Sequence, residues 1–290
     1  MTTRFVAEVS SNHNRNLERC FQFIDTAAAT GCDAVKFQLF RIEQLFAPEI
    51  LNKSPEHRKR KEWELPVDFL PELHRRCKDA GIQFACTPFY LHAVEELLPY
   101  VSFYKIASYE LLWNKLLTAC AQTGKPVVLS TGMASMDEIK GAADVLRDAG
   151  CKDLTLLHCV SNYPTPVSEC SLSVIETLRQ TIHDEACGMD THFGWSDHSR
   201  SPAVIYRAVH KWHAEMIEFH LDLDTKGTEF RYGHCWLPHE MERVISEVRS
   251  GFMADGRPDA IMSEAEKPER IWRRDPADGL RPFRSQRNLY

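Results

Sequence analysis

The sequence predicts a (β/α)₈ barrel, and three observations lead to this fold class. Short apolar segments alternate strictly with longer amphipathic ones, a pattern typical of a parallel sheet joined by crossover helices. The alternation repeats eight times, which is the number of units that closes such a barrel. The chain has 290 residues, enough for a barrel of roughly 250 residues with a short extension.

Each predicted strand is a short apolar run bounded by turn residues, and each predicted helix is a longer run with a helical repeat of apolar residues. The strands are expected at residues 5–10, 34–40, 83–89, 103–108, 127–131, 154–160, 192–198 and 216–222. The helices are expected at residues 17–30, 67–80, 91–98, 113–122, 136–149, 172–183, 202–212 and 238–249.

Local signals support several of these boundaries. Ser135 with Glu138 three residues later is a capping-box pattern, Gly81 ends the helix before it, and Pro202 stands in the first turn of another helix. Residues 41–66 are interpreted as a long polar connection. The basic run at residues 58–61 is interpreted as a solvated part of that connection.

We expect one large domain, the barrel at residues 1–250, and a tail at residues 251–290 that packs on the barrel or extends from it. An open doubly wound sheet is the alternative fold. That fold would need a glycine-rich first turn to bind a nucleotide. Residues 10–14 read Ser-Ser-Asn-His-Asn and contain no glycine, which favours the barrel.

Composition argues against several classes of partner. The net charge of −6 gives no support for nucleic-acid binding, and no apolar run approaches the ~18 residues of a membrane span. The chain starts almost directly with the first strand, without the pattern of a signal peptide. Ten cysteines occur without any C-x-x-C spacing, as expected for reduced thiols. We therefore expect a cytoplasmic protein.

Polar side chains recur where the predicted strands end. Catalytic groups of a barrel lie at the C-terminal ends of its strands. The residues concerned are Glu8, Lys36, Gln38, Thr87, Lys105, Ser108, Glu110, Ser130, Asn162, Tyr163, Ser196, His198, Glu218, His220 and Asp222. We therefore predict an active site at this mouth of the barrel.

Lys36 and Lys105 interrupt otherwise apolar strands. Burying an ammonium group without a partner is costly, and an anion held between the two lysines would supply that partner. The lysines would suit a ligand that carries both a phosphate and a carboxylate group. The same ligand could accept hydrogen bonds from the nearby hydroxyls of Thr87, Ser108, Ser130 and Ser196. The alternative is internal pairing of the lysines with Glu8 or Glu110.

His198 and His220 end adjacent strands and could reach one metal ion. Imidazole nitrogens combined with carboxylate and water oxygens suit Mn²⁺, Mg²⁺, Zn²⁺ or Fe²⁺. Glu8 could complete the ligand shell directly or through water. The alternative is a pair of hydrogen-bonded histidines that hold no metal.

At these residues the chain resembles the sialic acid synthase family, enzymes that join phosphoenolpyruvate to N-acetylmannosamine or a related sugar. The resemblance covers about residues 5–250. The matching motifs are Ala7-Glu8-Val9, Asn12-His13-Asn14, Ala34-Val35-Lys36-Phe37-Gln38, Gly81-Ile82-Gln83-Phe84, Thr87-Pro88-Phe89, Tyr104-Lys105-Ile106-Ala107-Ser108 with Glu110, Gly124-Lys125-Pro126, Leu129-Ser130-Thr131-Gly132-Met133, Leu157-His158-Cys159, Ser161-Asn162-Tyr163-Pro164-Thr165-Pro166, Ser196-Asp197-His198, and Glu218 with His220.

The resemblance implies a role for each matched position. The residues that would hold phosphoenolpyruvate are Lys36, Thr87, Lys105, Ser108, Ser130, Asn162 and Ser196. Those that would face the sugar are Gln38, Glu110 and Tyr163, with Glu229 as the candidate acidic contact. His198 and His220 would ligate the metal, Mn²⁺ or Mg²⁺, and the catalytic set would be Glu8, Glu110, His198 and His220.

The implied reaction is an aldol-like condensation that needs a metal and consumes phosphoenolpyruvate. The metal polarises the sugar aldehyde, C3 of phosphoenolpyruvate attacks it, water adds at C2 and phosphate leaves. The product is a 2-keto-3-deoxy sugar acid. Glu8 would orient or deprotonate a metal-bound water.

The sequence departs from the family pattern at Phe219, Tyr90 and Arg15, where the family usually has lysine, aspartate and glycine. We also expect no counterpart of the family's C-terminal antifreeze-like domain, which lends an arginine to the neighbouring subunit's sugar site. We expect these changes to fall on the sugar side of the site. The resemblance therefore implies phosphoenolpyruvate and a metal and leaves the identity of the sugar open.

Two other functions fit the same residues. One is a metal-dependent aldolase that acts on a 2-keto acid without phosphoenolpyruvate. The other is a non-catalytic, synthase-like binding protein. In each case the expected partners are small molecules, and a homodimer formed through the barrel faces is compatible with the sequence.

Overall fold

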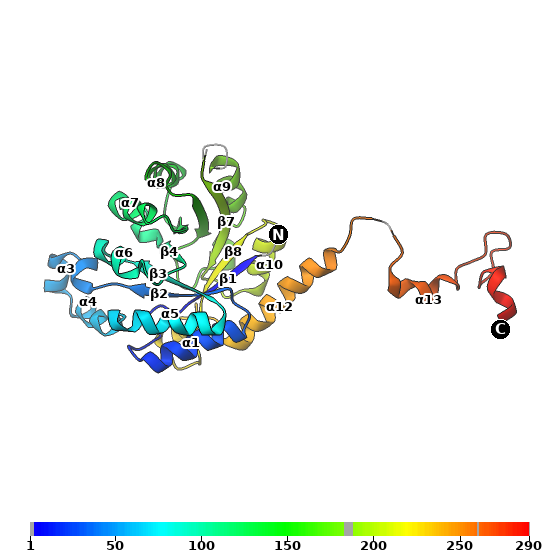
Figure 1. Cartoon of the computed structure of the whole chain (residues 1–290), viewed down its shortest axis with the longest axis horizontal. Helices are drawn as coiled ribbons and strands as arrows, with labels where there is room; N and C mark the ends of the chain where they lie inside the picture. Colours follow the sequence, from blue (N-terminus) through cyan, green and yellow to red (C-terminus); the bar gives the residue numbers. More distant parts are fainter. Residues whose placement is uncertain (1–2, 183–187, 260, 290) are drawn as a thin grey trace. The chain divides into compact units, whose positions relative to one another are not determined.

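The computed structural model describes residues 3–182, 188–259 and 261–289, and its eight strands form one closed barrel (Figure 1). All neighbouring strands are parallel and follow chain order, with β8 beside β1. The strands are β1 (Arg4–Glu8), β2 (Ala34–Leu39), β3 (Gln83–Pro88), β4 (Phe103–Ile106), β5 (Val127–Ser130), β6 (Asp153–Cys159), β7 (Asp190–Asp197) and β8 (Met216–His220). The predicted fold class is confirmed.

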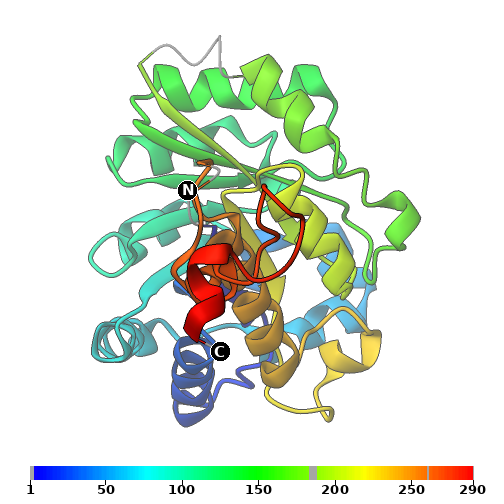
Figure 2. The same cartoon turned by 90° about the vertical axis from the view of Figure 1, so that its right-hand side faces the viewer.

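A main helix follows each strand, and Figures 1 and 2 show these helices around the strands. They are α1 (Leu17–Ala29), α5 (Leu70–Ala80), α6 (Leu91–Leu97), α7 (Asn114–Gln122), α8 (Met136–Asp148), α9 (Val174–Ile182), α10 (Pro202–His210) and α12 (Pro238–Asp255). The capping box at Ser135 and Glu138 is present. Of the predicted helix at residues 172–183, His183 lies outside the described residues.

The barrel interior is closed by a layer of apolar side chains. Its members are Val6, Ala34, Ala85, Phe103, Val128, Leu157 and Met216, one from each strand except β7. At the level of Leu157, β7 carries Gly194, where an added Cβ would lie 2.3 Å from the carbonyl oxygen of Met216. Glycine is therefore needed there for the close approach of β7 to β8.

The residues two positions after this layer are mostly polar. Side chains two apart on a strand share a face, so these residues form the next layer toward the C-terminal mouth. They are Glu8, Lys36, Thr87, Lys105, Ser130, Cys159, Ser196 and Glu218. The apolar layer thus supports the polar one, and the fold itself determines where the site lies.

The predicted polar connection at residues 41–66 has helical structure that was not predicted. It contains α2 (Ile42–Leu45), α3 (Pro48–Lys53), α4 (Pro55–Lys59) and a 3₁₀ turn at Arg60–Trp63. Pro48 and Pro55 begin two of these helices, where proline has no amide hydrogen to leave unpaired. Ile42 and Leu65 are buried, so both ends of the segment are anchored in the core.

Two further short helices, besides α2, α3 and α4, lie outside the predicted set. The connection after β8 contains α11 (Thr228–Tyr232), which ends at Gly233 with φ 92°. The chain divides into two compact units, residues 1–251 and 252–290. The second contains α13 (Lys267–Arg270), and there Asp278 pairs with Arg284 and Arg287.

The described residues contain neither a membrane span nor a disulfide. None of their helices combines the length and the apolar composition that crossing a bilayer requires. Their nine cysteines are all free and buried, as is common for thiols that serve as small core residues.

Candidate active site

Two adjoining cavities open at the C-terminal mouth of the barrel. The inner cavity, about 540 Å³, is lined by side chains of the strand ends, including Lys36 and Lys105. The outer cavity, about 440 Å³, is lined by the connections after β1, β2 and β8, including Glu229. Both cavities share the side chains of Gln38, Arg60, Tyr109, Tyr163 and His220.

Most of the predicted site residues line these cavities. The inner cavity is lined by Glu8, Lys36, Gln38, Lys105, Ser108, Glu110, Ser130, Tyr163, Ser196, His198 and His220. Glu229 lines the outer one. Thr87 and Asn162 line neither: the Thr87 hydroxyl is buried without a hydrogen-bond partner, and Asn162 is exposed.

The two lysines lie on either side of one carboxylate, that of Glu218, on the floor of the inner cavity. Lys36 Nζ lies 2.7 Å from Glu8 Oε2, in an ion pair without hydrogen-bond geometry, and 3.1 Å from Glu218 Oε2. Lys105 Nζ lies 3.6 Å from Glu218 Oε1 and donates to Ser130 Oγ at 2.7 Å. The alternative of internal pairing therefore occurs for Glu8, which pairs with Lys36, but not for Glu110, and Glu218 is the partner that both lysines share.

Burial shifts the protonation of these groups in different directions. Burial lowers the pKa of Lys36 to about 8, although Glu218 opposes the shift. Burial disfavours ionised Glu218, but Lys105 and Lys36 outweigh it and lower the pKa of Glu218 to about 2. Burial raises the pKa of Glu110 to about 7, and its Oε2 has no hydrogen-bond partner. Glu110 can therefore exchange a proton near neutral pH.

His198 and His220 present neutral rings to the inner cavity. His198 Nδ1 donates to the Val160 carbonyl at 2.8 Å, and His220 Nδ1 lies 3.3 Å from Glu229 Oε2. These partners are acceptors, so each ring carries its proton on Nδ1 and leaves the Nε2 lone pair available. Burial lowers the pKa of His198 to about 3 and lowers that of His220 as well. The ring centroids are 5.4 Å apart.

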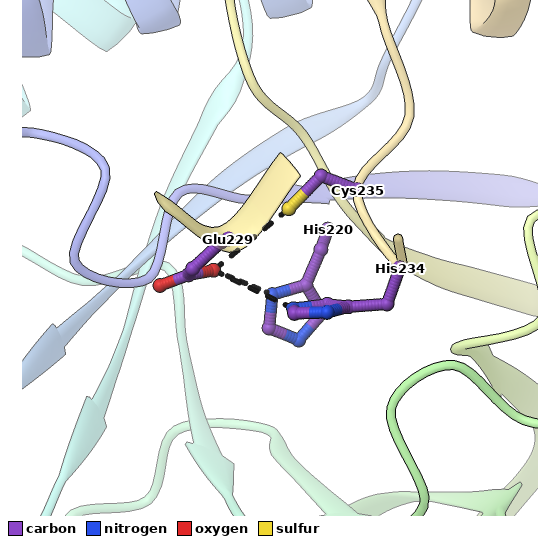
Figure 3. A group of neighbouring side chains, drawn as sticks. All are labelled: His220, Glu229, His234 and Cys235. Carbon is purple, nitrogen blue, oxygen red and sulfur yellow. Dashed lines mark hydrogen bonds and ion pairs between the residues drawn. The ribbon is translucent and has the colours of Figure 1, made fainter. Parts of the chain in front are cut away.

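Glu229 belongs to a second group of side chains that could hold a metal ion (Figure 3). Ligand atoms of His220, Glu229, His234 and Cys235 lie within 4.8 Å of one another. Glu229 Oε2 is 3.7 Å from His234 Nε2 and 3.9 Å from Cys235 Sγ. His198 is not in this group. His234 and Cys235 were not predicted because they follow α11 and not a strand end, although a histidine next to a cysteine is a visible signal in the sequence.

Ser11 holds the far oxygen of the Glu229 carboxylate. Its backbone amide and its hydroxyl donate to Glu229 Oε1 at 3.1 and 2.7 Å. Burial disfavours the carboxylate, but the hydrogen bond from His220 and the nearby His234 ring keep the pKa of Glu229 well below its usual range. Both oxygens of the Glu229 carboxylate therefore already have neighbouring donors, one of which is His220 Nδ1.

Asp197 fixes the loop that carries His198. Its carboxylate is fully buried and accepts hydrogen bonds from Nε1 of Trp195 at 3.0 Å and of Trp236 at 2.9 Å. It also accepts from the Ser199 hydroxyl at 2.6 Å and the Arg200 amide at 3.1 Å.

Substitution Asp197→Asn is expected to lower the free energy of unfolding by about 3 kcal/mol. The new amide group would face N–H donors and would leave at least one of them unpaired. Urea denaturation measures the effect. Asp190→Asn, at an exposed position of the same strand, is the control and should change stability by less than about 0.5 kcal/mol. Equal stability of the two variants would contradict this role of Asp197.

The family departures do not fall on the sugar side, contrary to the prediction, because none of the three lines either cavity. Phe219 alternates with Glu218 and His220, so its fully buried ring faces away from the barrel interior. Tyr90 is buried, and its hydroxyl donates a hydrogen bond to the Glu96 carboxylate. Arg15 has φ 53°, a left-handed conformation that glycine adopts more easily.

Similarity to known proteins agrees with this site. Residues 23–259 match the NeuB family. The chain is 34% identical over 248 residues to an uncharacterized protein of Methanocaldococcus jannaschii, which is 85% of this chain and 70% of that protein. It is 32% identical over 278 residues to the N,N'-diacetyllegionaminic acid synthase of Campylobacter jejuni, covering 90% of this chain and 80% of that enzyme.

A solved structure is similar over most of its length. The N-acetylneuraminic acid synthetase of Leptospira borgpetersenii, in complex with citrate, superposes with a TM-score of 0.78 at 28% identity. The match covers 93% of this chain and 90% of that chain. The resemblance to sialic acid synthases that the motifs indicated is confirmed, and this chain belongs to the NeuB family.

Proposed function

We propose that this protein condenses phosphoenolpyruvate with the aldehyde group of a sugar to give a 2-keto-3-deoxy sugar acid and inorganic phosphate. The observation that carries the proposal is the pair of buried ammonium groups, Lys36 and Lys105, on the floor of the inner cavity. The similarity to enzymes named as sugar acid synthases supports it.

Phosphoenolpyruvate would bind between the lysines and the hydroxyls of the inner cavity. Glu218 and Glu8 hold the ammonium groups in place before the substrate arrives. Charge-assisted hydrogen bonds to a phosphate and a carboxylate would then replace part of this pairing. The hydroxyls that line the same space are those of Ser108, Ser130 and Ser196.

The described residues fit a divalent metal at His198 and His220. Both imidazoles are neutral, both line the inner cavity, and each has an uncommitted Nε2. When bound, Mn²⁺ or Mg²⁺ would supply Lewis acidity that polarises the sugar aldehyde. Glu229 would position His220 through Nδ1, as acidic groups behind metal-bound histidines commonly do.

The chain's own acids would move the protons of the reaction. A bond forms between C3 of phosphoenolpyruvate and the aldehyde carbon, and Glu110 donates the proton that the aldehyde oxygen takes up. Water then adds at C2 and loses one proton; as the bond between C2 and the bridging oxygen breaks, the new C2 hydroxyl gives its other proton to the leaving phosphate and the keto group forms. Glu8, held by Gln38 Nε2 at 2.7 Å and the Ser10 amide at 2.9 Å, accepts the proton of that water.

These protonation states predict that kcat/KM for phosphoenolpyruvate falls as pH rises. Lys36 is cationic below its pKa of about 8, and Glu110 can donate a proton below its pKa of about 7. Activity should therefore decline near pH 7 and again near pH 8. Glu110→Gln should lower the rate and leave only the decline near pH 8. A flat profile from about pH 6 to about pH 9 would contradict these assignments.

The direct test is phosphate release from phosphoenolpyruvate across a panel of aldoses in the presence of Mn²⁺. We expect release that depends on one or more of the sugars. Release from none of them would count against the proposal. Calorimetry with phosphoenolpyruvate and with pyruvate separates the rivals: an aldolase would bind pyruvate and not phosphoenolpyruvate, and a binding protein would release no phosphate.

A further inference from the structure

Arg60 lies at the junction of the two cavities and has no anionic partner among the described residues. It lies in the 3₁₀ turn that follows α4, and its side chain lines both cavities. Its guanidinium carbon is 5.5 Å from the ring centroids of Phe46 and Trp63. Its Nε is buried and has no hydrogen-bond partner among the described residues.

Among the described residues, the other cations that line the two cavities, Arg19, Lys36 and Lys105, all have anionic partners. Arg19 pairs with Asp222 at 3.0 Å, Arg41 with Glu96 at 2.8 Å and Lys61 with Glu43 at 2.5 Å. Arg58, in the same basic run as Arg60, donates to the Leu51 carbonyl and is exposed. The expectation that the whole run is solvated is therefore wrong for Arg60, which is half-buried and turned toward the cavities.

The surroundings of Arg60 hold it ready for an anion. Two aromatic rings fix the plane of the guanidinium by cation–π contact and keep water from part of it. A guanidinium held in this way presents a planar fork of donors that matches a carboxylate or a phosphate. Glu229, which lines the same outer cavity, is already occupied by Ser11, His220 and His234.

We propose that Arg60 binds a phosphate or carboxylate group of the acceptor sugar, so that the preferred acceptor is an anionic aldose. This inference rests on the proposed function, because it assigns the outer cavity to the second substrate. The inner cavity already supplies Lys36 and Lys105 to phosphoenolpyruvate, so Arg60 is not needed there. The acceptor's aldehyde end would lie near His220 and its charged end at Arg60, with Tyr109 and Tyr163 lining the space between them.

The test is a comparison of three acceptors that share one carbon skeleton: a neutral aldose, its terminal phosphate ester and its terminal carboxylate. We expect kcat/KM for an anionic acceptor to exceed that for the neutral one by about 100-fold. Arg60→Gln should remove this preference and leave KM for phosphoenolpyruvate unchanged. Arg60→Lys should restore it in part. Arg58→Gln, at an exposed position of the same run, is the control and should behave as the unaltered protein.

Binding is measured separately from turnover. The alditol phosphate of the same skeleton cannot react, and calorimetry should show that Arg60→Gln weakens its binding about 100-fold. Equal use of neutral and anionic acceptors, unaffected by Arg60→Gln, would overturn the inference and leave the proposed function standing. A raised KM for phosphoenolpyruvate in Arg60→Gln would also overturn it. Arg60-dependent binding without phosphate release in any arm would support the anion site and reject the synthase function.

Discussion

Replacing His220 with alanine is expected to abolish metal binding and to lower kcat by roughly 1,000-fold or more. His220 is shared by the His198 pair and by the group around Glu229, so its loss disrupts every candidate metal site among the described residues. Metal content after equilibrium dialysis against Mn²⁺ measures the first effect. Phosphate release at saturating phosphoenolpyruvate measures the second.

Two further variants decide which ligands accompany His220. If His198 and His220 hold the ion, His198→Ala should lose the metal and Cys235→Ser should keep it. Cys235 belongs to the group around Glu229, and its Sγ lies 3.9 Å from the Glu229 carboxylate. Retention of metal by His198→Ala together with its loss from Cys235→Ser would assign the ion to the Glu229 group and refute our ligand assignment.

Replacing Lys36 with methionine is expected to weaken the binding of phosphoenolpyruvate by at least about 100-fold. Methionine keeps the length of the side chain but removes the charge. Glu8 and Glu218, which now lie 2.7 and 3.1 Å from Lys36, would then repel the anionic substrate. Calorimetric titration with phosphoenolpyruvate measures the change.

The control for this variant is Lys115→Met, at an exposed position of α7, which should bind phosphoenolpyruvate normally. Breaking a buried pair also costs stability, about 3–5 kcal/mol, so the titration should be run well below the midpoint of thermal unfolding. Lys105→Met, which breaks the contact to Ser130 and Glu218, should weaken binding similarly. Unchanged affinity in both lysine variants would contradict the anion site.

The sequence predicted the barrel and the floor of its site because both depend on short-range rules. A residue two positions after an inward-facing apolar residue also faces the barrel interior. The inward direction of Glu8 therefore follows from that of Val6, and the inward direction of Lys105 follows from that of Phe103. A strand end of a barrel is also the usual place for catalysis. Periodicity and strand position together were therefore enough to predict that Lys36, Lys105, His198 and His220 lie at one mouth of the barrel.

The rest of the site could not be predicted because it comes from connections without such a period. Arg60 reaches the cavities only because helices fold residues 41–66 over the mouth, and a run of charges gives no sign of that packing. His234 and Cys235 meet His220 through the turn made by α11. Pairing of Lys36 with Glu218 depends on the register between strands, which the sequence of one strand does not contain.

The most direct measurement is ¹³C NMR of a reaction that contains phosphoenolpyruvate labelled at C3, Mn²⁺ and an anionic aldose. We predict that the label moves from the vinyl CH₂ into the saturated CH₂ next to a new carbon–carbon bond, in step with phosphate release. Label that stays in phosphoenolpyruvate, or that appears only in the methyl group of pyruvate, would show that no such bond is formed at this site.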